Sequence, residues 1–462
     1  MSLKMKVVTK EEKFQKGKDL RKKCSRSKHA EWSDSLRSID PLRLLENSNI
    51  DRISDLVAIR YKRMSESPFK FFRGSAIIQA RDLANSPKSG INIQVCGDCH
   101  LMNFGGFATP ERNLVFDIND FDETFFGPWE WDVKRLAVSF VLTSRELGFS
   151  DRFAKDTVRE VTSSYRTRLL EFSKMTYLQR WYAKITIEDL QKFFHKSNDT
   201  LNRLRKIQTL ATAKTSETLF PKITSFKDGH PRIEDNPPLI YHYRKIPQAF
   251  KSQNSLLNSY KKTLQDDRRK LLEKYNLEDS VIKVVGIGSV GTRCFVVLFY
   301  ADGSEPLFLQ IKEARRSVIE KSQGKSIYDH QGYRIVHGQH LMQAASDIFL
   351  GWFRSDTGRD YYVRQLRDMK ISPKFETFKQ RTLLDYATIC GWALARAHSK
   401  GGEASMISGY LGTSEKFDEA LVKYATDYAN QVELDFKAFK GAIASERFNI
   451  QLREERLLEF EI

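Results

Sequence analysis

Cysteine, long apolar runs and hydrophobic leader segments are scarce or missing in this sequence. Its five cysteines are too few and too scattered for a disulfide framework, which predicts a reduced, cytoplasmic setting. The pair Cys96 and Cys99 has no second pair at zinc spacing, so a metal or redox site shared with His100 is only an alternative. No apolar run reaches the length of a membrane span, and the Lys-rich N-terminus lacks a signal-like apolar stretch. We therefore expect a cytoplasmic protein without a transmembrane segment.

Acidic residues are outnumbered by basic ones. The chain of 462 residues has 76 Lys and Arg against 59 Asp and Glu, which gives a net charge of +17. This excess favours a negatively charged partner such as nucleotide, nucleic acid or an anionic membrane surface, although a well-solvated basic surface explains it equally well. No nucleic-acid-binding motif accompanies the charge. The hydrophobic share of 40% excludes a disordered chain, and the length predicts two to three domains.

Polar residues gather in the segment Val95 to Asp122, which reads VCGDCHLMNFGGFATPERNLVFDINDFD. Asp98 lies in a Gly-containing turn after the apolar stretch 91–95, and Asn103 follows five residues later. A second strand-like run, 114–118, ends in Asn119-Asp120-Phe121-Asp122. Carboxylate and amide oxygens at the ends of adjacent strands can converge on Mg²⁺. A carboxylate that stays free of metal could accept a proton from a hydroxyl group.

A glycine-rich turn lies far downstream. The run 281–285 is β-branched, Gly286-Ile287-Gly288-Ser289-Val290-Gly291 follows, and two more strand-like runs lead to Lys312. A dinucleotide-binding turn needs a helix directly after the glycines, whereas this sequence has a strand. A phosphate-covering loop has a different arrangement, in which the glycines lie between two strands and a third strand, after a turn, carries a Lys. In that arrangement Lys312 would pair with the α/β-phosphates. A Gly-rich hairpin with a surface Lys is the simpler alternative.

Three further segments fit the same arrangement. Asp132 follows Gly127-Pro128 in the first turn of a helix, where a dipole-stabilised acid is also a sufficient explanation. The run 361–366, which contains Gln365, could contact adenine through its backbone. The sequence 382–398, TLLDYATICGWALARAH, predicts a well-patterned helix ending in His. Arg73, beside Gly74, could reach a phosphate, although a structural role is the simpler interpretation.

The spacing G-D-x-H-x-x-N, a strand and then D-F-D resembles the catalytic segment of protein-kinase-like phosphotransferases, in particular the aminoglycoside and choline kinase branch. By this resemblance Asp98 is the base, Asn103 and Asp120 hold Mg²⁺, and Asp122 competes with Asp120 as ligand. The resemblance implies further roles, catalytic or supporting for His100 and Asp132 and nucleotide-binding for Gly286, Gly288, Gly291, Lys312 and Gln365. Kinases pair the Lys with a Glu on the next helix, but 330–347 offers Gln339 and Gln343, so the partner of Lys312 stays open.

The kinase-like parts occur in the opposite order along this chain. The catalytic segment comes first and the glycine turn second. The kinase-like run of the second half ends with the helix at His398, and in kinase-like folds a helix of this kind directly precedes the catalytic loop with which the first half begins. We therefore expect an α+β protein with a circularly permuted protein-kinase-like fold, made of a helical C-lobe and a small antiparallel β N-lobe. The expected parts are a basic arm (1–50), the helical C-lobe (51–278) with the catalytic segment 95–122, the β-rich N-lobe (279–370), and helices returning to the C-lobe (371–462).

The whole chain also resembles a bacterial family called domain of unknown function 2252. The resemblance covers about residues 17 to 430 and rests on stretches such as RYKRMSESPFKFFRG, CGDCHLMNFG, FDINDFDETFFGPWEWDVKRLAVS, VVGIGSVGTRCFVVL and GQHLMQAASDIFLGW. The family name gives no substrate.

Three functions stay open. The first is an ATP- and Mg²⁺-dependent phosphotransferase acting on a hydroxyl acceptor, by analogy a small molecule. The second keeps the fold but transfers AMP or only binds nucleotide as an inactive scaffold. The third is a basic nucleic-acid-binding protein, which the charge of +17 alone suggests.

Overall fold

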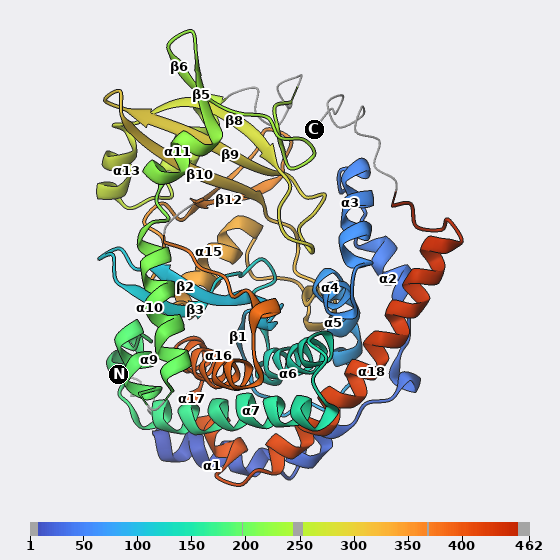
Figure 1. The fold of residues 1–462 in the computed structure, drawn as a ribbon. Coiled ribbons are helices and arrows are strands. Elements are labelled where there is room, and N and C mark those ends of the chain that lie inside the picture. Colours follow the sequence, from blue (N-terminus) through green and yellow to red (C-terminus); the bar gives the residue numbers. More distant parts are fainter. Residues whose placement is uncertain (1–7, 196, 244–252, 367–368, 451–462) are drawn as a thin grey trace, which may run out of the picture.

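The protein has an antiparallel sheet packed above a larger helical part, as Figure 1 shows. The structure is a computed structural model and describes residues 8–195, 197–243, 253–366 and 369–450. The expected α+β class is confirmed by its helices and its single six-stranded antiparallel sheet. None of the helices in this described part is both long and apolar enough to cross a membrane.

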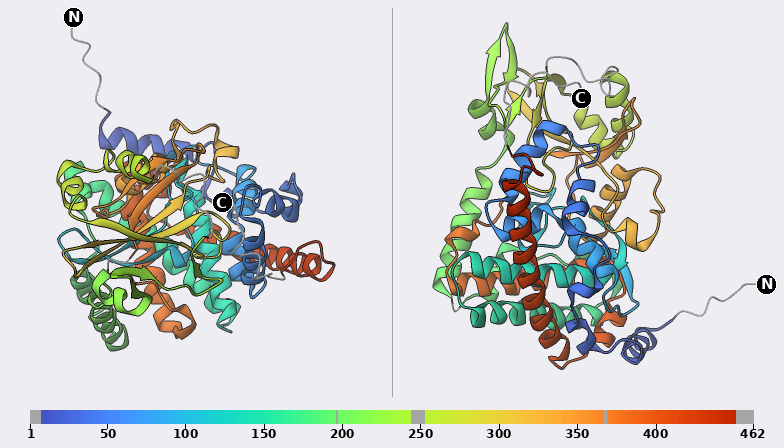
Figure 2. Two further views of the ribbon diagram at one scale, coloured as in Figure 1. Left: turned by 90° about the horizontal axis from the view of Figure 1, so that it is seen from above. Right: turned by 90° about the vertical axis from the view of Figure 1, so that its right-hand side faces the viewer.

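The N-terminal segment forms five α-helices that pack on the helical part. Their bounds are α1 Lys10–Leu20, α2 Pro41–Asn47, α3 Ser54–Met64, α4 Pro68–Gly74 and α5 Ala76–Ala84. The Thr9 side chain and Glu12 form a capping box at the start of α1. Helix α1 lies along α17 (Ala404–Leu411), where a Cβ added to Gly17 would meet the Met406 carbonyl oxygen at 1.9 Å. Helix α1 of the segment expected as a basic arm is therefore docked on the helical part, as Figure 2 also shows, while residues 1–7 of that segment lie outside the described part.

The segment that carries the sequence-predicted acids forms two short pairs of antiparallel strands. Strand β1 (Asn92–Val95) pairs with β4 (Phe125–Pro128), and β2 (Phe104–Ala108) pairs with β3 (Leu114–Ile118). Helix α6 (Trp129–Glu146) follows β4 directly and is almost entirely buried. These strands and α6 belong to the largest hydrophobic core of the protein.

Helix α6 packs against a bundle of long helices. The helices α7 (Asp151–Lys174) and α16 (Gln380–Gly401) lie together, and α18 (Lys416–Ala444) crosses both α6 and α7. The expected helix 382–398 lies within α16. Four shorter helices follow α7 along the chain, namely α8 (Tyr177–Tyr182), α9 (Ile187–Phe193), α10 (Asn198–Thr212) and α11 (Ser216–Ile223). Of the expected returning helices, residues 451–462 lie outside the described part.

The six-stranded sheet has the order β11-β12-β10-β9-β8-β7, and every neighbouring pair is antiparallel. Its strands are β7 (Ile240–Tyr241), β8 (Asn276–Lys283), β9 (Cys294–Ala301), β10 (Glu305–Glu313), β11 (Gly351–Arg354) and β12 (Asp360–Gln365). Helices α12 (Gln253–Lys261) and α13 (Asp266–Leu272) precede β8, whereas α14 (Glu320–Gln323) and α15 (Gln331–Met342) connect β10 to β11. The sheet has a hydrophobic core of its own.

One expected loop has regular structure instead. In the sequence, the turn-rich stretch 222–245, with Asp228-Gly229 and Asn236-Pro237-Pro238, predicts a loop or lid. Its described residues instead contain the hairpin β5 (Thr224–Lys227) and β6 (His230–Ile233) and then strand β7. The Asp228-Gly229 turn connects β5 to β6, because both residues adopt positive φ angles of 53° and 81°. Residues 244 and 245 of the predicted loop lie outside the described part.

Candidate functional site

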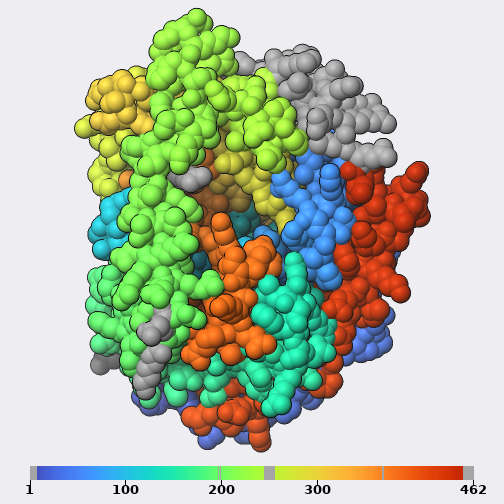
Figure 3. All heavy atoms as spheres, in the orientation of Figure 1, coloured from blue at the N-terminus to red at the C-terminus, as the bar shows by residue number. Residues whose placement is uncertain are grey.

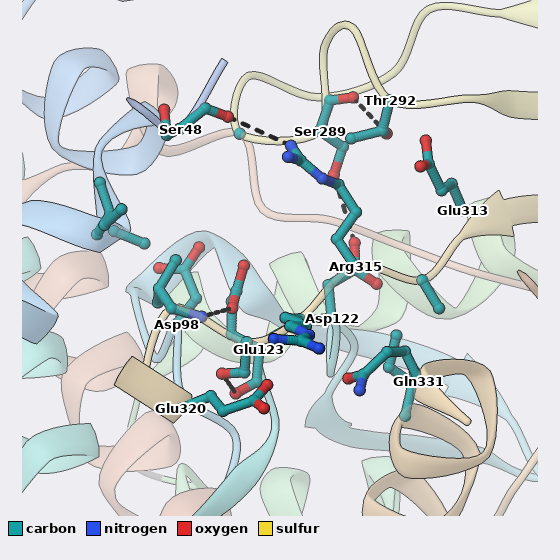
Figure 4. Close-up of a pocket in the computed structure, with 18 of the residues that line it drawn as sticks. Ser48, Asp98, Asp122, Glu123, Ser289, Thr292, Glu313, Arg315, Glu320 and Gln331 are labelled. Carbon is teal, nitrogen blue, oxygen red and sulfur yellow. Dashed lines mark hydrogen bonds between the residues drawn. The ribbon is translucent and has the colours of Figure 1, made fainter. Parts of the chain in front are cut away.

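A cleft between the sheet and the helical part contains two adjoining cavities, of about 920 and 420 Å³. Asn103, Asp120, Gly286 and Ser289 line both cavities, so the segment 95–122 and the glycine turn meet at their boundary. Figure 3 shows the molecule hollowed between the sheet and the helices below it, and Figure 4 shows part of the larger cavity. Segments almost two hundred residues apart in sequence therefore form one site.

The turn that carries Asp98 is hydrogen-bonded to Asp132 at the start of α6. The Asp132 carboxylate accepts hydrogen bonds from the backbone N–H groups of Cys96 at 2.8 Å and Gly97 at 2.9 Å. His398 of α16 lies 3.1 Å from the same carboxylate through Nε2, and its Nδ1 lies 2.8 Å from the Tyr165 hydroxyl. Asp132 thus fixes the backbone of the turn before Asp98 through two hydrogen bonds.

Asp98 points into the larger cavity, where it is bound by one guanidinium group. Arg135, three residues after Asp132 on α6, donates from Nε to the Asp98 carboxylate. Arg135 is itself fixed by Gln79 at 3.0 Å and by the Phe72 carbonyl at 3.1 Å. Burial raises the pKa of Asp98 above its ordinary value, although the charge of Arg135 opposes this shift. A raised pKa makes this carboxylate a stronger base than a free Asp.

Asn103 and Asp120 offer oxygen atoms at the boundary of the two cavities. The Asn103 amide nitrogen donates to the Asp98 carbonyl at 2.6 Å, which leaves the amide oxygen as a possible ligand atom. The Asn119 backbone N–H donates to the Asn103 carbonyl at 2.7 Å and ties the two motifs together. Asp120 accepts one 3.3 Å hydrogen bond from the Asp122 backbone N–H, and it forms no ion pair with any of the described residues. Hard oxygen atoms of this kind fit Mg²⁺.

Asp122 is the acidic partner of Lys312. Its carboxylate accepts a hydrogen bond from Lys312 Nζ at 2.6 Å and another from the Tyr362 hydroxyl at 2.6 Å. Burial alone would raise the pKa of Asp122, but the attraction of Lys312 and these hydrogen bonds hold it below its usual range. On α15, Gln339 instead donates to Gln343. Because both oxygens of Asp122 have protein donors, Asp120 is the freer carboxylate of the two.

The glycine turn between β8 and β9 presents free backbone donors. Gly286 and Gly291 adopt positive φ angles of 67° and 88°, which side chains disfavour. The backbone N–H groups of Ile287, Gly288 and Ser289 donate to no acceptor within the described ranges. A Cβ on Gly288 would come within 3.3 Å of the Arg73 carbonyl, so the turn lies close to α4. Successive free N–H groups in such a turn can bind phosphate oxygens.

The smaller cavity lies behind Lys312, toward the end of β12. Gln365 lines it, and its backbone N–H donates to Asp347, while Arg364 donates to Gln310 at 3.1 Å and to the Asn119 carbonyl at 3.3 Å. Burial and the charge of Arg364 lower the pKa of Lys370, at the far side of this cavity, to about 7. Residues 367 and 368, which continue from β12, lie outside the described part.

His100 and the neighbouring thiols are packed into the protein interior. His100 Nε2 lies 3.9 Å from Asp98, and burial with the charges of Arg73 and Arg135 holds its pKa well below the usual value. Cys96 and Cys99 lie close to Asp132, but burial raises the pKa of both thiols, that of Cys99 to about 11. Protonated thiols are poor metal ligands, and the Asp132 oxygens already accept the loop N–H groups.

Sequence reasoning missed several cations around the cleft. Arg135 had a readable signal, because it lies three residues after Asp132 and therefore on the same face of α6. Arg52, Arg60 and Arg315 had none, because only the folded chain brings them to one wall of the larger cavity. Asp117, which lies in the strand-like run before Asp120, is fully buried and paired with Arg396 at 2.9 Å, and it lines neither cavity.

The fold and this cleft define an α+β protein with an acidic site beside a glycine turn. The chain belongs to the family described as an uncharacterized protein conserved in bacteria (DUF2252), which matches residues 52–442. No curated protein and no solved structure matches the chain.

Proposed function

We propose that this protein is an ATP- and Mg²⁺-dependent phosphotransferase that acts on a hydroxyl group of a small molecule. The observation that carries the proposal is the meeting of Asp98, Asn103 and Asp120 with the glycine turn at the boundary of two cavities. Phosphoryl transfer needs this arrangement, because nucleotide and acceptor must approach the same phosphorus atom from opposite sides.

The strand order supports a kinase-like arrangement of the nucleotide. The glycine turn connects β8 to β9, and Lys312 lies on the next strand, β10, beside β12. Protein kinases likewise place the glycine loop over the phosphates and the phosphate-binding Lys on the third strand. The smaller cavity would accept the base and ribose between Gln365 and Lys370, with the phosphates toward Lys312 and the turn.

Each catalytic role follows from a described contact. Asp98 would take the proton of the acceptor hydroxyl while the acceptor oxygen bonds to the γ-phosphorus, and the bond to the β,γ-bridging oxygen breaks to release ADP. Arg135 and the Asp132 contacts hold the Asp98 turn in place. Asp120 and Asn103 would hold Mg²⁺, which neutralises charge on the transferring phosphate. Lys312 would bind the phosphates beside Asp122.

Thermal denaturation with ATP, with and without Mg²⁺, tests the proposal. Binding to the folded state raises Tm by mass action, by about 2.7 kcal/mol of added stability at a hundredfold excess over Kd. We expect a Mg²⁺-dependent rise that Asp120→Asn loses, and that the exposed control Asp151→Asn keeps. Removal of Mg²⁺ with EDTA should reverse the rise in the native protein.

Turnover separates the proposed reaction from related ones. Incubation of the protein with ATP, Mg²⁺ and a library of hydroxyl compounds, followed by mass spectrometry, should give products heavier by one phosphoryl group. Adducts heavier by AMP would instead establish adenylyl transfer. Nucleotide binding without any Mg²⁺-dependent product would contradict the phosphotransferase proposal.

A further inference from the structure

The wall of the larger cavity opposite the Asp98 turn carries three guanidinium groups. Arg52, Arg60 and Arg315 all line this cavity and all donate to Ser48. Arg52 and Arg315 donate to the Ser48 carbonyl oxygen at 2.9 and 3.3 Å, and Arg60 donates to the Ser48 hydroxyl at 3.0 Å. Figure 4 shows Arg315 extending toward Ser48, with Asp98 and Glu123 below it. The three cations therefore converge on one place.

None of these guanidinium groups has an ion-pair partner in the described parts of the chain. Their other acceptors are backbone carbonyls and one amide oxygen, those of Val290, Gly74, Ile50 and Asn49. By contrast, Arg359 on the same cavity wall pairs with both Asp51 and Glu313. Within the described residues, the positive charge of the cluster is therefore not balanced by a carboxylate, whereas that of Arg359 is balanced by two.

Burial makes this uncompensated charge costly. Arg60 is 1% exposed, and its Nε has no hydrogen-bond partner. Burial lowers the pKa of Arg60 to about 10. Burial, together with repulsion from Arg60 and Arg315, also lowers the pKa of Arg52, and the charges of Glu123 and Glu313 oppose that shift only in part. Buried cations are destabilising unless an anion balances them. An anion that enters with the substrate would supply this balance.

We propose that the cluster binds the phosphate group of a phosphorylated small-molecule acceptor. This inference rests on the proposed function and names its substrate class, a phosphate monoester that also carries a free hydroxyl group. Guanidinium groups bind phosphate oxygens in pairs with defined geometry, and a cavity of about 920 Å³ has the size of a small-molecule site. With its phosphate at the cluster, the acceptor would direct its hydroxyl toward Asp98, and the product would carry two phosphate groups.

Three exposed cations at the same cavity support an anionic ligand. Arg316, Lys321 and Lys325 line it and form no ion pair with any residue in the described ranges. They raise the local concentration of anions near the entrance. Arg73, whose buried Nε also lacks a partner, lies between the glycine turn and Asp98.

Titration with inorganic phosphate tests the cluster, with the nucleotide site first filled by ADP and Mg²⁺ and ionic strength held constant with chloride. We expect phosphate to raise Tm further in the native protein. Arg315→Gln and Arg52→Gln should weaken apparent phosphate binding about tenfold or more. Arg159→Gln, on the outer face of α7, should leave it unchanged because Arg159 pairs only with Asp156 and Glu419.

The Arg315→Gln variant distinguishes this inference from the nucleotide proposal. The response of Arg315→Gln to ADP and Mg²⁺ should match that of the native protein, since Arg315 lines the larger cavity and not the smaller one. Arg52→Gln is compared for phosphate binding alone, because Arg52 also donates to the Val290 carbonyl in the glycine turn. Equal phosphate binding in native protein and Arg315→Gln would overturn the inference, and so would a loss of the nucleotide response in that variant. If Arg315→Gln does not fold, Arg315→Lys keeps the charge without the planar fork and should still weaken phosphate binding.

Discussion

At the scale of single residues, Asp98 carries the chemistry that we propose. Asp98→Asn keeps the size of the side chain and removes its ability to accept a proton. We expect the transfer rate to fall by about 10²- to 10⁴-fold, while the Mg²⁺-dependent rise in Tm with ATP persists. Steady-state kinetics together with thermal denaturation would measure both effects, and an unchanged rate would exclude Asp98 as the base.

The raised pKa of Asp98 also predicts how the rate depends on pH. Burial moves this pKa above the ordinary value, and only the deprotonated carboxylate can accept the hydroxyl proton. The rate should therefore reach a plateau above the raised pKa and fall as pH drops through it. A pH–rate profile of kcat/KM would show the midpoint above about 4, the value for a free Asp.

The pair formed by Asp122 and Lys312 predicts a change in stability. Asp122→Asn leaves the buried Lys312 ammonium without its carboxylate, which should cost about 1–3 kcal/mol at pH 7. Since the folded-state pKa of Asp122 is lowered, its contribution is complete above the unfolded-state pKa of about 3.9 and disappears as pH falls further.

Urea denaturation at several pH values would measure this contribution. The difference between the native protein and Asp122→Asn should shrink as pH falls below about 4. Asp427→Asn is a suitable control, because Asp427 pairs with Lys423 on the exposed face of α18, and this change should stay within about 0.5 kcal/mol. A pH-independent cost would mean that Asp122 acts through packing alone.

At the scale of helices, the close contact of α1 with α17 depends on two glycines. A Cβ on Gly17 would meet the Met406 carbonyl at 1.9 Å, and one on Gly409 would meet the Phe14 carbonyl at 2.0 Å. Gly17→Ala should therefore lower the free energy of unfolding by about 1–3 kcal/mol, because the helices must move apart. A Cβ on Gly441 of α18 would meet no atom within 4 Å, so Gly441→Ala should raise the free energy of unfolding by about 0.5–1 kcal/mol. Chemical denaturation of both variants would detect the opposite signs.

The elements also show how far the sequence could predict the site. The spacing around Asp98 and Asp120 and the glycines before Lys312 are local patterns, and the structure brings all of these segments to one cleft. Asp122 as partner of Lys312 could not be predicted, because the pairing depends on how the sheet sits on the helical part. The hairpin β5–β6 could not be predicted, because the Asp228-Gly229 turn and the prolines of the stretch 222–245 are typical of irregular loops.

At the scale of the whole molecule, the cleft separates a hydrophobic core in the sheet from a larger one in the helices. ATP with Mg²⁺ would contact both sides, so its binding should slow amide hydrogen exchange in the turn 286–291 and the segment 98–103. Peptides from α7, which lies beneath α6 and α16 in Figure 1, should exchange at unchanged rates. Mass spectrometry would resolve these regions, and equal slowing in α7 would indicate general stabilisation instead.

The ion pair of Asp117 with Arg396 has a consequence for biosynthesis. Both side chains are completely buried. The buried Asp132 carboxylate likewise has a partner far downstream in the chain, His398. While a ribosome makes the chain, Asp117 emerges 279 residues before Arg396, and Asp132 emerges 266 residues before His398. An unpaired carboxylate cannot be buried cheaply, so the nascent N-terminal half should stay incompletely packed until α16 has left the ribosome. The site would then become competent only after α16 has emerged.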